Sequence, residues 1–304
     1  MNPAVKARIL AEALPYIRAY HGKVLVIRFG GAAMTDPELK AGFARDVALL
    51  RLVGMQPIVV HGGGWQIDRL LLQMGTPPAK HDGLRVTDET TLNVVEMVLG
   101  ELNQELTGLL NKHGSPAVGL DGQDGGFIRA RKLALPTQVG AATPDPGFVG
   151  DVESIDLSLI RLLLSRHFVP VIMPIGVGAD GSAYHINSDR LAGRLARELG
   201  AEKLVLMTNV AGVPGADGKL AYILTARETE ALLAGHRLEP ALERRVRAAL
   251  TAVREGVQSV HIIDGGVPHA LLLEVLTAEG VGTAVRSDAG PHFLEDSKSY
   301  LLDV

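Results

Sequence analysis

The pattern that most restricts the fold of this chain is a repeated alternation between short apolar runs and longer stretches with helical spacing. The apolar runs are rich in Val and Ile, as buried strands are, and each is followed by a turn and a helical pattern. Strands that alternate with helices pair in parallel, and the helices then cover both faces of the sheet. The sequence therefore predicts an α/β fold, a three-layer αβα sandwich with a mostly parallel central sheet. The predicted strands are 24–27, 57–60, 170–173, 204–207 and 260–263, and the helical patterns include 38–54, 65–74, 189–199 and 269–279.

The composition excludes several classes of function. The chain has no cysteine, so disulfides, thiolate metal sites and a cysteine nucleophile are excluded, and a reducing cytoplasm is the expected compartment. The net charge is −4, only 4% of the residues are aromatic, and no basic stripe is interleaved with aromatics, which argues against nucleic acid as a partner. No apolar run is long enough to cross a bilayer. We expect a soluble, cytoplasmic protein with no membrane partner.

The domain organisation has three parts. Residues 1–20 are predicted to form a separate amphipathic helix that Pro15 kinks. This helix either caps its own domain or makes contacts between subunits, and the sequence alone leaves both readings open. Residues 21–286 form the main domain, with an N-terminal half at 21–180 and a C-terminal half at 181–286, and the tail 287–304 is not assigned.

Two glycine-rich turns follow predicted strands near the N-terminus. They are Gly30-Gly31 and the run 62–64. Glycine lets backbone N–H groups approach an anion without a Cβ in the way, and a following helix N-terminus adds positive potential. Neither turn fits the Walker A pattern or the spaced glycines of a dinucleotide fold. Two such turns on neighbouring strands favour a phosphate or carboxylate site built on a different scheme.

The order of the motifs resembles the amino-acid-kinase family, and within it the N-acetylglutamate kinases. The resemblance covers residues 9 to 286, and it implies the amino-acid-kinase fold. It also implies transfer of the γ-phosphoryl group of ATP to the side-chain carboxylate of N-acetylglutamate, early in arginine biosynthesis. The motifs that carry the resemblance are 22–31, 61–64 (HGGG), 82–88 (DGLRVTD), 118–120 (VGL), 124–126 (DGG), 147–150 (GFVG) and 260–265 (VHIIDG).

The resemblance implies that the side of the site that holds the acceptor is largely retained. Gly63 and Gly64 match the turn that holds the acyl-amino-acid substrate, and Arg85 matches the arginine that grips its α-carboxylate. Asn187 matches the second asparagine of the family's Asn-x-Asn-Ala-Asp motif, and Asp189 matches its aspartate, which organises the catalytic lysines. The competing reading of Arg85 is a solvated surface arginine.

The donor side departs from the family at five positions. Arg28 stands where the family has a lysine that contacts the transferred phosphoryl group, and Arg245 is the nearest match to the second catalytic lysine. Asn209 replaces an aspartate at the nucleotide turn, which also includes Gly30 and Gly31. His185 replaces the first asparagine of the substrate motif, and Gln123 replaces a common lysine. Arginine keeps the charge but is larger and fixed in geometry, so these exchanges are not conservative in a close-packed site.

A third set of residues resembles the regulatory site of arginine-inhibited members. Those members use an N-terminal helix to join dimers into a hexamer, and they bind L-arginine between that helix and the C-terminal half. The matching positions are Tyr16, Lys203, His261, Glu274 and Gly280. A carboxylate such as that of Glu274 can pair with a guanidinium. The competing reading is inherited scaffold, with Lys203 a solvated lysine at a strand edge and His261 a satisfied core histidine.

Three functional readings follow. The favoured one is an acetylglutamate-kinase-like protein with an impaired phosphoryl-transfer site and a retained L-arginine site, acting as a regulatory or scaffolding subunit. The alternative is an active ATP-dependent N-acetylglutamate 5-kinase in which arginines replace the lysines. The third is a kinase with another acyl-amino-acid acceptor, because His185 changes the expected surroundings of the α-carboxylate.

The resemblance also sets expectations for cofactors and partners. MgATP would be the donor of an active enzyme, and Mg²⁺ would be held mainly by the phosphates, so no dedicated protein metal site is predicted. We expect a homo-oligomer, a dimer or a hexamer. A partner enzyme of arginine biosynthesis is a further expectation.

Overall fold

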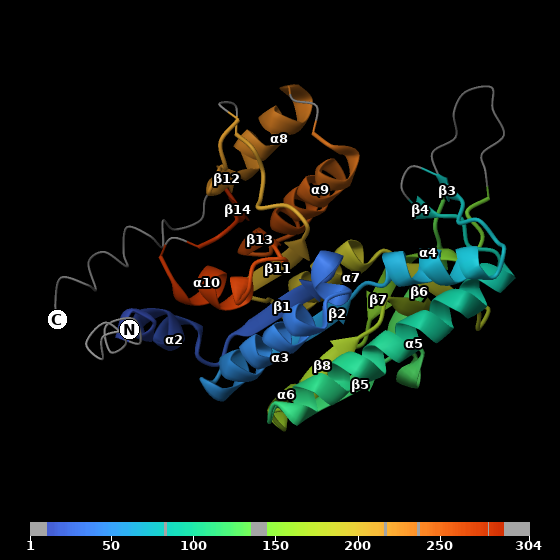
Figure 1. The fold of residues 1–304 in the computed structure, drawn as a ribbon, viewed down its shortest axis with the longest axis horizontal. Coiled ribbons are helices and arrows are strands. Elements are labelled where there is room, and N and C mark those ends of the chain that lie inside the picture. Colours follow the sequence, from blue (N-terminus) through green and yellow to red (C-terminus); the bar gives the residue numbers. More distant parts are fainter. Residues whose placement is uncertain are drawn as a thin grey trace.

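The molecule is built on one large twisted sheet (Figure 1). The computed structural model describes residues 11–81, 84–134, 145–215, 218–235, 238–278 and 280–288. All neighbouring strands of the sheet pair in parallel except β13 and β14, which confirms the predicted mostly parallel α/β fold. In spatial order the strands are β12 (Ile223–Thr225), β14 (Thr283–Arg286), β13 (Ser259–Asp264), β11 (Lys203–Thr208), β1 (Val24–Phe29), β2 (Gln56–His61), β8 (Val169–Ile172) and β5 (Ala117–Leu120).

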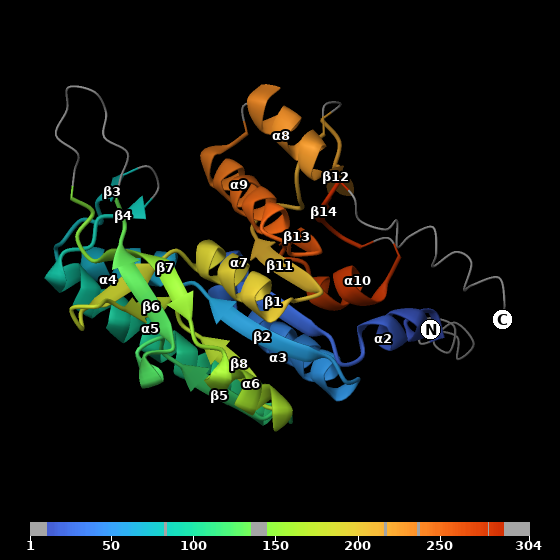
Figure 2. The ribbon, with the colours of Figure 1, turned by 180° about the vertical axis from the view of Figure 1, so that it is seen from behind.

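Helices cover both faces of the sheet, as the alternating pattern predicts. Figure 1 shows one layer in front of the sheet, and Figure 2 shows the other layer from behind. Two separate clusters of buried apolar side chains, one on each face, hold the three layers together. The first layer contains α2 (Leu14–Tyr20), α3 (Pro37–Leu52), α4 (Gly64–Gln73), α5 (Glu89–Lys112) and α10 (Ala270–Leu276), and the second contains α6 (Ser158–Ser165), α7 (Ser188–Leu199), α8 (Ala226–Gly235) and α9 (Pro240–Arg254).

Strand β1 shows how the sequence sets the two faces. Successive side chains of a strand point to opposite faces of the sheet. Leu25, Ile27 and Phe29 therefore pack into the core under α3 and α5, whereas Val26 packs into the core under α7 and α9. Arg28 follows Val26 by two residues and shares its face. The alternation thus places a guanidinium at the end of a central strand, on the side of α7.

Smaller elements lie beside one end of the sheet. A four-stranded barrel contains β6 (Ile128–Lys132), β7 (Val149–Ile155), β9 (Ile175–Val177) and β10 (Ala183–Ile186). The short strands β3 (Lys80–His81) and β4 (Leu84–Arg85) pair antiparallel. Two 3₁₀ turns, η1 (Gly31–Met34) and η2 (Asp124–Gly126), complete the described elements. The barrel brings β10, which leads into α7, next to the glycine turn after β2.

The N-terminal helix packs on its own domain. Helix α2 begins at Leu14, and Pro15 lies in its first turn, where the missing N–H costs no helical hydrogen bond. Tyr16 and Tyr20 are buried in the core that α3 and α10 share. This packing favours the capping reading, and contacts between subunits stay a prediction. The first ten residues and the tail beyond 288 lie outside the described residues, and no described helix is long and apolar enough to cross a membrane.

Candidate functional site

The acceptor residues predicted from the sequence line one chamber of about 180 Å³. It lies where the turn after β2 meets β4, β10 and the start of α7. Three cationic side chains line this chamber, and its described lining contains no carboxylate. Because anions are the ligands that such a lining stabilises, the chamber fits a small anionic molecule. The lining residues are Arg28, Gly62, Gly63, Gly64, Lys80, Leu84, Arg85, Val149, Pro174, His185, Asn187 and Ser188.

Arg85 is held rigidly in this chamber. It is only 7% exposed, so the reading of Arg85 as a solvated surface residue is wrong. Its Nη1 pairs with the carboxylate of Asp68, and its Nη2 donates to the carbonyl of Gly64 at 3.1 Å. Its Nε is buried and has no hydrogen-bond partner among the described residues. An unpaired buried donor is costly, so this Nε is suited to donate a hydrogen bond to a ligand oxygen.

Two histidines, the buried His61 and the half-buried His185, contribute to the surroundings of the chamber in their neutral form. Burial lowers the pKa of His61 to about 4, and it lowers the pKa of His185 to about 4 with Arg85 adding to the effect. The two ring nitrogens of His61 lie 2.9 Å from the carbonyl of Gly62 and 3.2 Å from the amide nitrogen of Asn103. These partners assign a neutral ring that donates to Gly62 and accepts from Asn103. His61 therefore fixes the glycine turn without adding charge.

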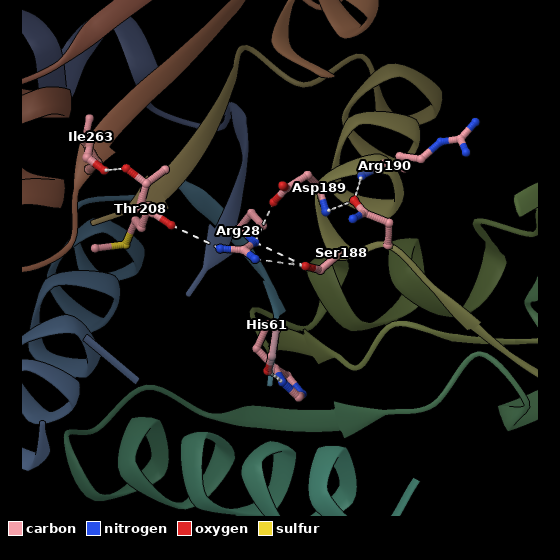
Figure 3. Close-up of polar contacts among 10 residues, drawn as sticks. Arg28, His61, Ser188, Asp189, Arg190, Thr208 and Ile263 are labelled. Atoms are coloured by element: carbon pink, nitrogen blue, oxygen red, sulfur yellow. Dashed lines mark hydrogen bonds and ion pairs between the residues drawn. The ribbon is translucent and has the colours of Figure 1, made fainter. Parts of the chain in front are cut away.

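The Arg28 side chain points toward Ser188 and Asp189 at the start of α7 (Figure 3). Its guanidinium lies between the two glycine turns. A Cβ added at Gly30 would be 1.9 Å from Nη1 of Arg28, and one at Gly62 would be 3.2 Å from its Nη2. The gap that the glycines leave open is therefore filled by the guanidinium. Arg28 lines both the acceptor chamber and a larger groove on the other side, so it forms the boundary between the two spaces.

Each nitrogen of the Arg28 guanidinium has a partner in its own chain. Its Nε lies 2.7 Å from Oδ1 of Asp189, an ion pair whose angles fall short of a hydrogen bond. Nε and Nη2 donate to the hydroxyl of Ser188 at 3.2 and 3.1 Å, and Nη1 donates to the carbonyl of Met207 at 3.2 Å. Both charged side chains of the pair are nearly buried, at 12% and 13% exposure. The positive charge is thus already partnered before any phosphate arrives.

The structure brings Arg245 to the same place. Arg28, Asp189 and Arg245 all line the larger groove, which has a volume of about 710 Å³. Burial lowers the pKa of the Arg245 guanidinium, and the neighbouring cations Arg28 and Arg244 lower it further, while Asp189 acts in the opposite direction. The nucleotide-turn residues also lie together, because a Cβ at Gly31 would be 2.1 Å from the side-chain oxygen of Asn209.

Gln123 is the one departure that lies elsewhere. Its side-chain amide donates to Glu96 and to Asp121, both at 3.2 Å. In the part of the chain that the structure describes, Gln123 lines neither the acceptor chamber nor the groove. Its change from the family pattern therefore has no direct effect on the surroundings of Arg28.

The five residues of the predicted arginine site line a second, small cavity of about 70 Å³. It lies at the opposite end of β11 and β13, under α2 and α10. Tyr16, Lys203, His261, Glu274 and Gly280 all contribute to its lining, and Tyr20, Tyr222 and Arg286 join them. These lining residues are spread over most of the sequence, and the fold brings them together in one cavity.

The polar groups of this small cavity bind one another. Glu274 accepts from the N–H groups of Val281 and Gly282 at 2.7 and 3.1 Å, and its other oxygen lies 2.5 Å from Nδ1 of His261. Burial would raise the pKa of Glu274, but these contacts leave it below its ordinary value. Burial and the neighbouring Lys203 lower the pKa of His261 to about 4, so the imidazole is neutral at pH 7.

Lys203 completes this network. Its Nζ lies 3.1 Å from Nε2 of His261 and 4.9 Å from the centre of the Tyr20 ring. Burial and the repulsion of Arg286 lower the pKa of Lys203 to about 8. Lys203 is 6% exposed, so the reading of a solvated lysine is wrong, whereas His261 is a buried and hydrogen-bonded histidine as its competing reading predicts.

Comparison with known proteins identifies the family. Residues 23–264 match the amino acid kinase family, which is most of the chain. The chain belongs to the amino acid kinase family. Acetylglutamate kinase of Chromobacterium violaceum is 57% identical over 287 residues, which cover 94% of this chain and 99% of that protein. Acetylglutamate kinase of Polynucleobacter asymbioticus is 52% identical, over 94% of this chain and 96% of that protein.

Solved structures that resemble this chain agree with its assignment to this family. N-acetylglutamate synthase from Neisseria gonorrhoeae, complexed with coenzyme A and N-acetyl-glutamate, has a TM-score of 0.84 at 28% identity. The same synthase with coenzyme A and L-arginine has a TM-score of 0.79 at 27% identity. This chain spans 64% and 65% of the length of those synthase chains. Carbamate kinase from Giardia lamblia, at 16% identity and a TM-score of 0.62, shares the fold.

Sequence reasoning missed several residues of the family site. Lys80 lines the acceptor chamber, Asp68 pairs with both Lys80 and Arg85, and Ser188 binds Arg28. Arg286 lines the small cavity. Lys80 comes just before the motif that contains Arg85, which is the one signal in the sequence that could have suggested it. For Ser188 the signal was its place between Asn187 and Asp189.

Proposed function

We propose that this chain is an acetylglutamate-kinase-like protein of arginine biosynthesis whose phosphoryl-transfer site is impaired and whose small cavity binds L-arginine. The proposal of an impaired phosphoryl-transfer site rests on one observation. The guanidinium of Arg28 fills the gap between the two glycine turns, and Asp189, Ser188 and the carbonyl of Met207 already bind it. A bulky guanidinium whose Nε, Nη1 and Nη2 each already have a partner leaves little room and little free charge for a phosphoryl group.

The physical chemistry of phosphoryl transfer gives this observation its weight. Catalysis of this reaction depends on positioning and on stabilising charge on the equatorial oxygens of the transferred group. The loss of one well-placed donor costs roughly 10²–10³ in rate. To help transfer, Arg28 would have to exchange Asp189 and Ser188 for the phosphate. Groups that act as a unit are not additive, so the combined loss is not the product of single losses.

The acceptor chamber supports an N-acyl amino diacid as its ligand. Lys80 and Arg85 supply positive charge, and the buried Nε of Arg85 is a donor without a partner among the described residues. Neutral His185 and the amide of Asn187 are further polar groups of the lining. The likeness to acetylglutamate kinases, and to a synthase solved with N-acetyl-glutamate, makes N-acetylglutamate the leading candidate.

The small cavity supports an amino acid with a basic side chain. Lys203 and Arg286 can pair with an α-carboxylate, while Glu274 can pair with a guanidinium. The likeness to a synthase solved with L-arginine favours arginine. Because ligand pockets usually measure about 300 Å³ or more, the cavity of about 70 Å³ must open to admit it. Tyr222, which is 59% exposed at its rim, is a side chain that can move aside.

An active N-acetylglutamate 5-kinase is the second candidate. It is favoured by the cationic acceptor chamber, the Asp189 carboxylate beside Arg28, and the 57% identity to an acetylglutamate kinase. MgATP would be the donor in that case. No group of three or more His, Asp or Glu side chains among the described residues could hold a metal ion, so Mg²⁺ would arrive with the nucleotide. A third candidate, favoured by His185, is a kinase with another acyl-amino-acid acceptor.

Calorimetry with L-arginine tests the proposed regulatory site. We expect binding at millimolar concentration or tighter, weakened at least tenfold in Glu274→Gln because the guanidinium loses its carboxylate. Glu230→Gln is the matched control, since Glu230 is a half-exposed carboxylate paired with Arg254 far from the cavity. L-citrulline, which lacks the cation, should bind more weakly than arginine. No heat from arginine at millimolar concentration would contradict the proposal.

The acceptor is tested by release of ADP from MgATP with a panel of N-acyl amino acids. The proposal expects no acceptor-dependent release with any of them. Release with N-acetylglutamate would favour the second candidate, and release with a different acyl amino acid would favour the third. A cytoplasmic homo-oligomer, dimeric or hexameric, and a partner enzyme of arginine biosynthesis belong to the same proposal.

A further inference from the structure

Helix α5 reaches the glycine turn of the acceptor chamber through one buried polar side chain. Asn103 is 6% exposed and lies on the face of α5 that packs against the sheet. Its side-chain nitrogen lies 2.8 Å from the carbonyl oxygen of Val171 in β8 and 3.2 Å from Nε2 of His61 at the end of β2. His61 is completely buried, and its other ring nitrogen lies 2.9 Å from the carbonyl oxygen of Gly62. These contacts form a chain that runs from β8 through α5 to the turn at 62–64.

The carbonyl of Val171 fixes the direction of every hydrogen bond in this chain. A carbonyl oxygen can only accept, so the Asn103 atom that faces it must be the amide nitrogen and not the amide oxygen. This nitrogen has two hydrogens and only donates, which makes Nε2 of His61 the acceptor of its second bond. Because burial lowers the pKa of His61 to about 4, the ring is neutral at pH 7, and its one proton is then on Nδ1, where it donates to Gly62. One backbone carbonyl of β8 therefore sets the tautomer of His61.

The packing around Asn103 leaves room for this side chain and little else. A Cβ added at Gly119 in β5 would be 2.0 Å from Oδ1 of Asn103, so position 119 must be glycine if α5 is to hold the amide there. Two leucines of the same helix pack against the turn. A Cβ added at Gly63 would be 2.8 Å from Cδ2 of Leu99 and 3.0 Å from Cδ1 of Leu102. Helix α5 thus contacts the turn both through close packing and through the chain of hydrogen bonds.

The bond from His61 fixes the orientation of the peptide between Gly62 and Gly63. The peptide bonds of the described chain are trans, and in a trans peptide the C=O and the N–H point in opposite directions. Since the Gly62 carbonyl is turned toward the buried His61 ring, the N–H of Gly63 points the other way. Both glycines line the acceptor chamber, and glycine has no side chain that could hold the turn in place. The tautomer of His61 therefore determines how the turn presents its backbone.

We propose that Asn103 is a positioning residue for the acceptor chamber, because it sets the tautomer of His61 and through it the orientation of the peptide between Gly62 and Gly63. Asn103 is not among the described residues that line the chamber, so it acts without touching the ligand. The part of this inference that concerns a ligand rests on the proposed acceptor site. The tautomer of His61 is a property of the chain without ligand, so the two parts can be tested separately.

The first test is NMR of the full chain with ¹⁵N-labelled histidine, in which the ring nitrogens report at pH 7 whether each carries a proton. We expect His61, assigned by the loss of its signals in His61→Gln, to be protonated on Nδ1 and unprotonated on Nε2. Asn103→Leu is similar in size but has no N–H, so the other tautomer should become populated. The matched control is Asn111→Leu, which removes from the same helix an amide that binds the backbone of Ala117 at 3.0 and 3.3 Å. This control should leave the His61 signals unchanged.

The second test is calorimetry with N-acetylglutamate. Asn103→Leu should weaken binding about tenfold, the equivalent of one hydrogen bond, whereas Asn111→Leu should weaken it by less than about twofold. If Asn103 acts through His61, the combined variant Asn103→Leu, His61→Gln should bind no more weakly than His61→Gln alone. Additive losses would mean that the two residues act independently, and they would overturn the proposal.

The remaining outcomes also decide the question. A proton on Nε2 of His61 in the natural chain, or an unchanged tautomer in Asn103→Leu, would overturn the proposal whatever the ligand does. A changed tautomer with unchanged affinity would overturn the role in the chamber. Absence of binding to the natural chain would contradict the proposed acceptor instead, and the spectra without ligand would then decide alone whether Asn103 orients the turn.

A second variant covers the case in which Asn103→Leu does not fold. Asn103→Asp has the same shape but offers His61 an acceptor in place of a donor, so Nε2 should take up a proton. The natural tautomer in this variant would show that Asn103 does not set it.

Discussion

Two sites with opposite electrostatics lie at the two ends of strands β11 and β13. At one end, the carboxylate of Glu274 is bound by His261 and two backbone N–H groups, and the cavity beside it measures about 70 Å³. At the other end, Arg28 forms an ion pair with Asp189. The groove of about 710 Å³ beyond this pair is lined by more arginines than carboxylates. We refer to these as the closed end and the open end.

The difference shows what a ligand must do at each end. At the closed end Glu274, His261 and Lys203 bind one another, so a ligand that reaches them must replace existing contacts and the cavity must open. At the open end Arg244 and Arg245 make no ion pair among the described residues, so an anion that reaches these two gains favourable interactions without breaking an ion pair, whereas Arg190 and Arg247 are held by Asp151 and Glu243. Removal of the Glu274 carboxylate should therefore destabilise the closed end, whereas removal of the Arg244 or Arg245 charge should leave the open end unharmed.

The largest expected effect is on the stability of the closed end. Glu274→Ala leaves His261 and two buried N–H groups without their acceptor, and we expect a loss of about 3–5 kcal/mol in the free energy of unfolding. Arg245→Met at the open end should cost less than about 1 kcal/mol, because it removes a cation that has no ion-pair partner among the described residues. Urea unfolding at pH 7 measures both. Similar losses in the two variants would remove the distinction between the ends.

Acid should act on the closed end through His261, as it does on His61 and His185 beside the acceptor chamber, but not on the arginines of the open end. The pKa of His261 is about 4 in the folded chain and about 6.5 unfolded, so its contribution to stability is complete above pH 6.5 and is lost as pH falls from 6.5 toward 4. Between pH 7 and pH 5 this amounts to about 2 kcal/mol. His261→Gln should reduce the loss measured by urea unfolding at the two pH values by that amount. Arg245→Gln should keep the wild-type loss, because arginine does not titrate there.

Restoring lysines at the open end should change activity. Arg28→Lys combined with Arg245→Lys removes bulk from the gap between the glycine turns, and we expect acceptor-dependent ADP release to appear above the no-acceptor control, where the natural chain shows none. A chain that naturally works with arginines should instead lose activity in the double variant. Each single variant serves as a comparison, because groups that act together give non-additive effects.

The smallest effect concerns salt. Raising NaCl from 0.05 to 0.5 M should stabilise the open end by about 0.5 kcal/mol, because repulsion among its exposed arginines is screened. Arg244→Gln should reduce this gain, while Arg161→Gln should not. Thermal unfolding at the two salt concentrations measures the difference. An identical salt response in the natural chain and in both variants would show that repulsion among the arginines of the open end is not appreciable.

Much of the fold could be predicted because its signals are local. The Val- and Ile-rich runs and the helical spacing between them are enough to indicate the parallel sheet with helices on both faces. The predicted strands at 24–27, 204–207 and 260–263 lie within β1, β11 and β13. The site residues of both ends came from motif order, and the structure brings Arg28, Asp189 and Arg245 together, as it does Tyr16, Lys203 and Glu274.

The rest could not be predicted because it depends on packing between distant segments. Arg190 and Arg247 each lie on a polar helix face, where a solvated arginine is the ordinary expectation, and only the contact of α7 with α9 places them in one groove. Lys80 and Asp68 form an ion pair across twelve residues of chain that carry no periodic signal. Gln123 is the opposite case, a residue that was predicted to lie near the site and does not. The order of the motifs predicted it there, whereas in the structure its side chain binds Glu96.

The most direct test of the central claim is ADP release by concentrated purified protein with MgATP and N-acetylglutamate, with a no-acceptor control and an active acetylglutamate kinase alongside. Our account predicts no release above the no-acceptor control, because the guanidinium of Arg28 fills the transfer site and is already bound. Turnover within about a hundredfold of the active kinase would contradict it, because a hundredfold is the loss expected from removing one donor. That result would mean that the arginines perform the catalytic role of the lysines.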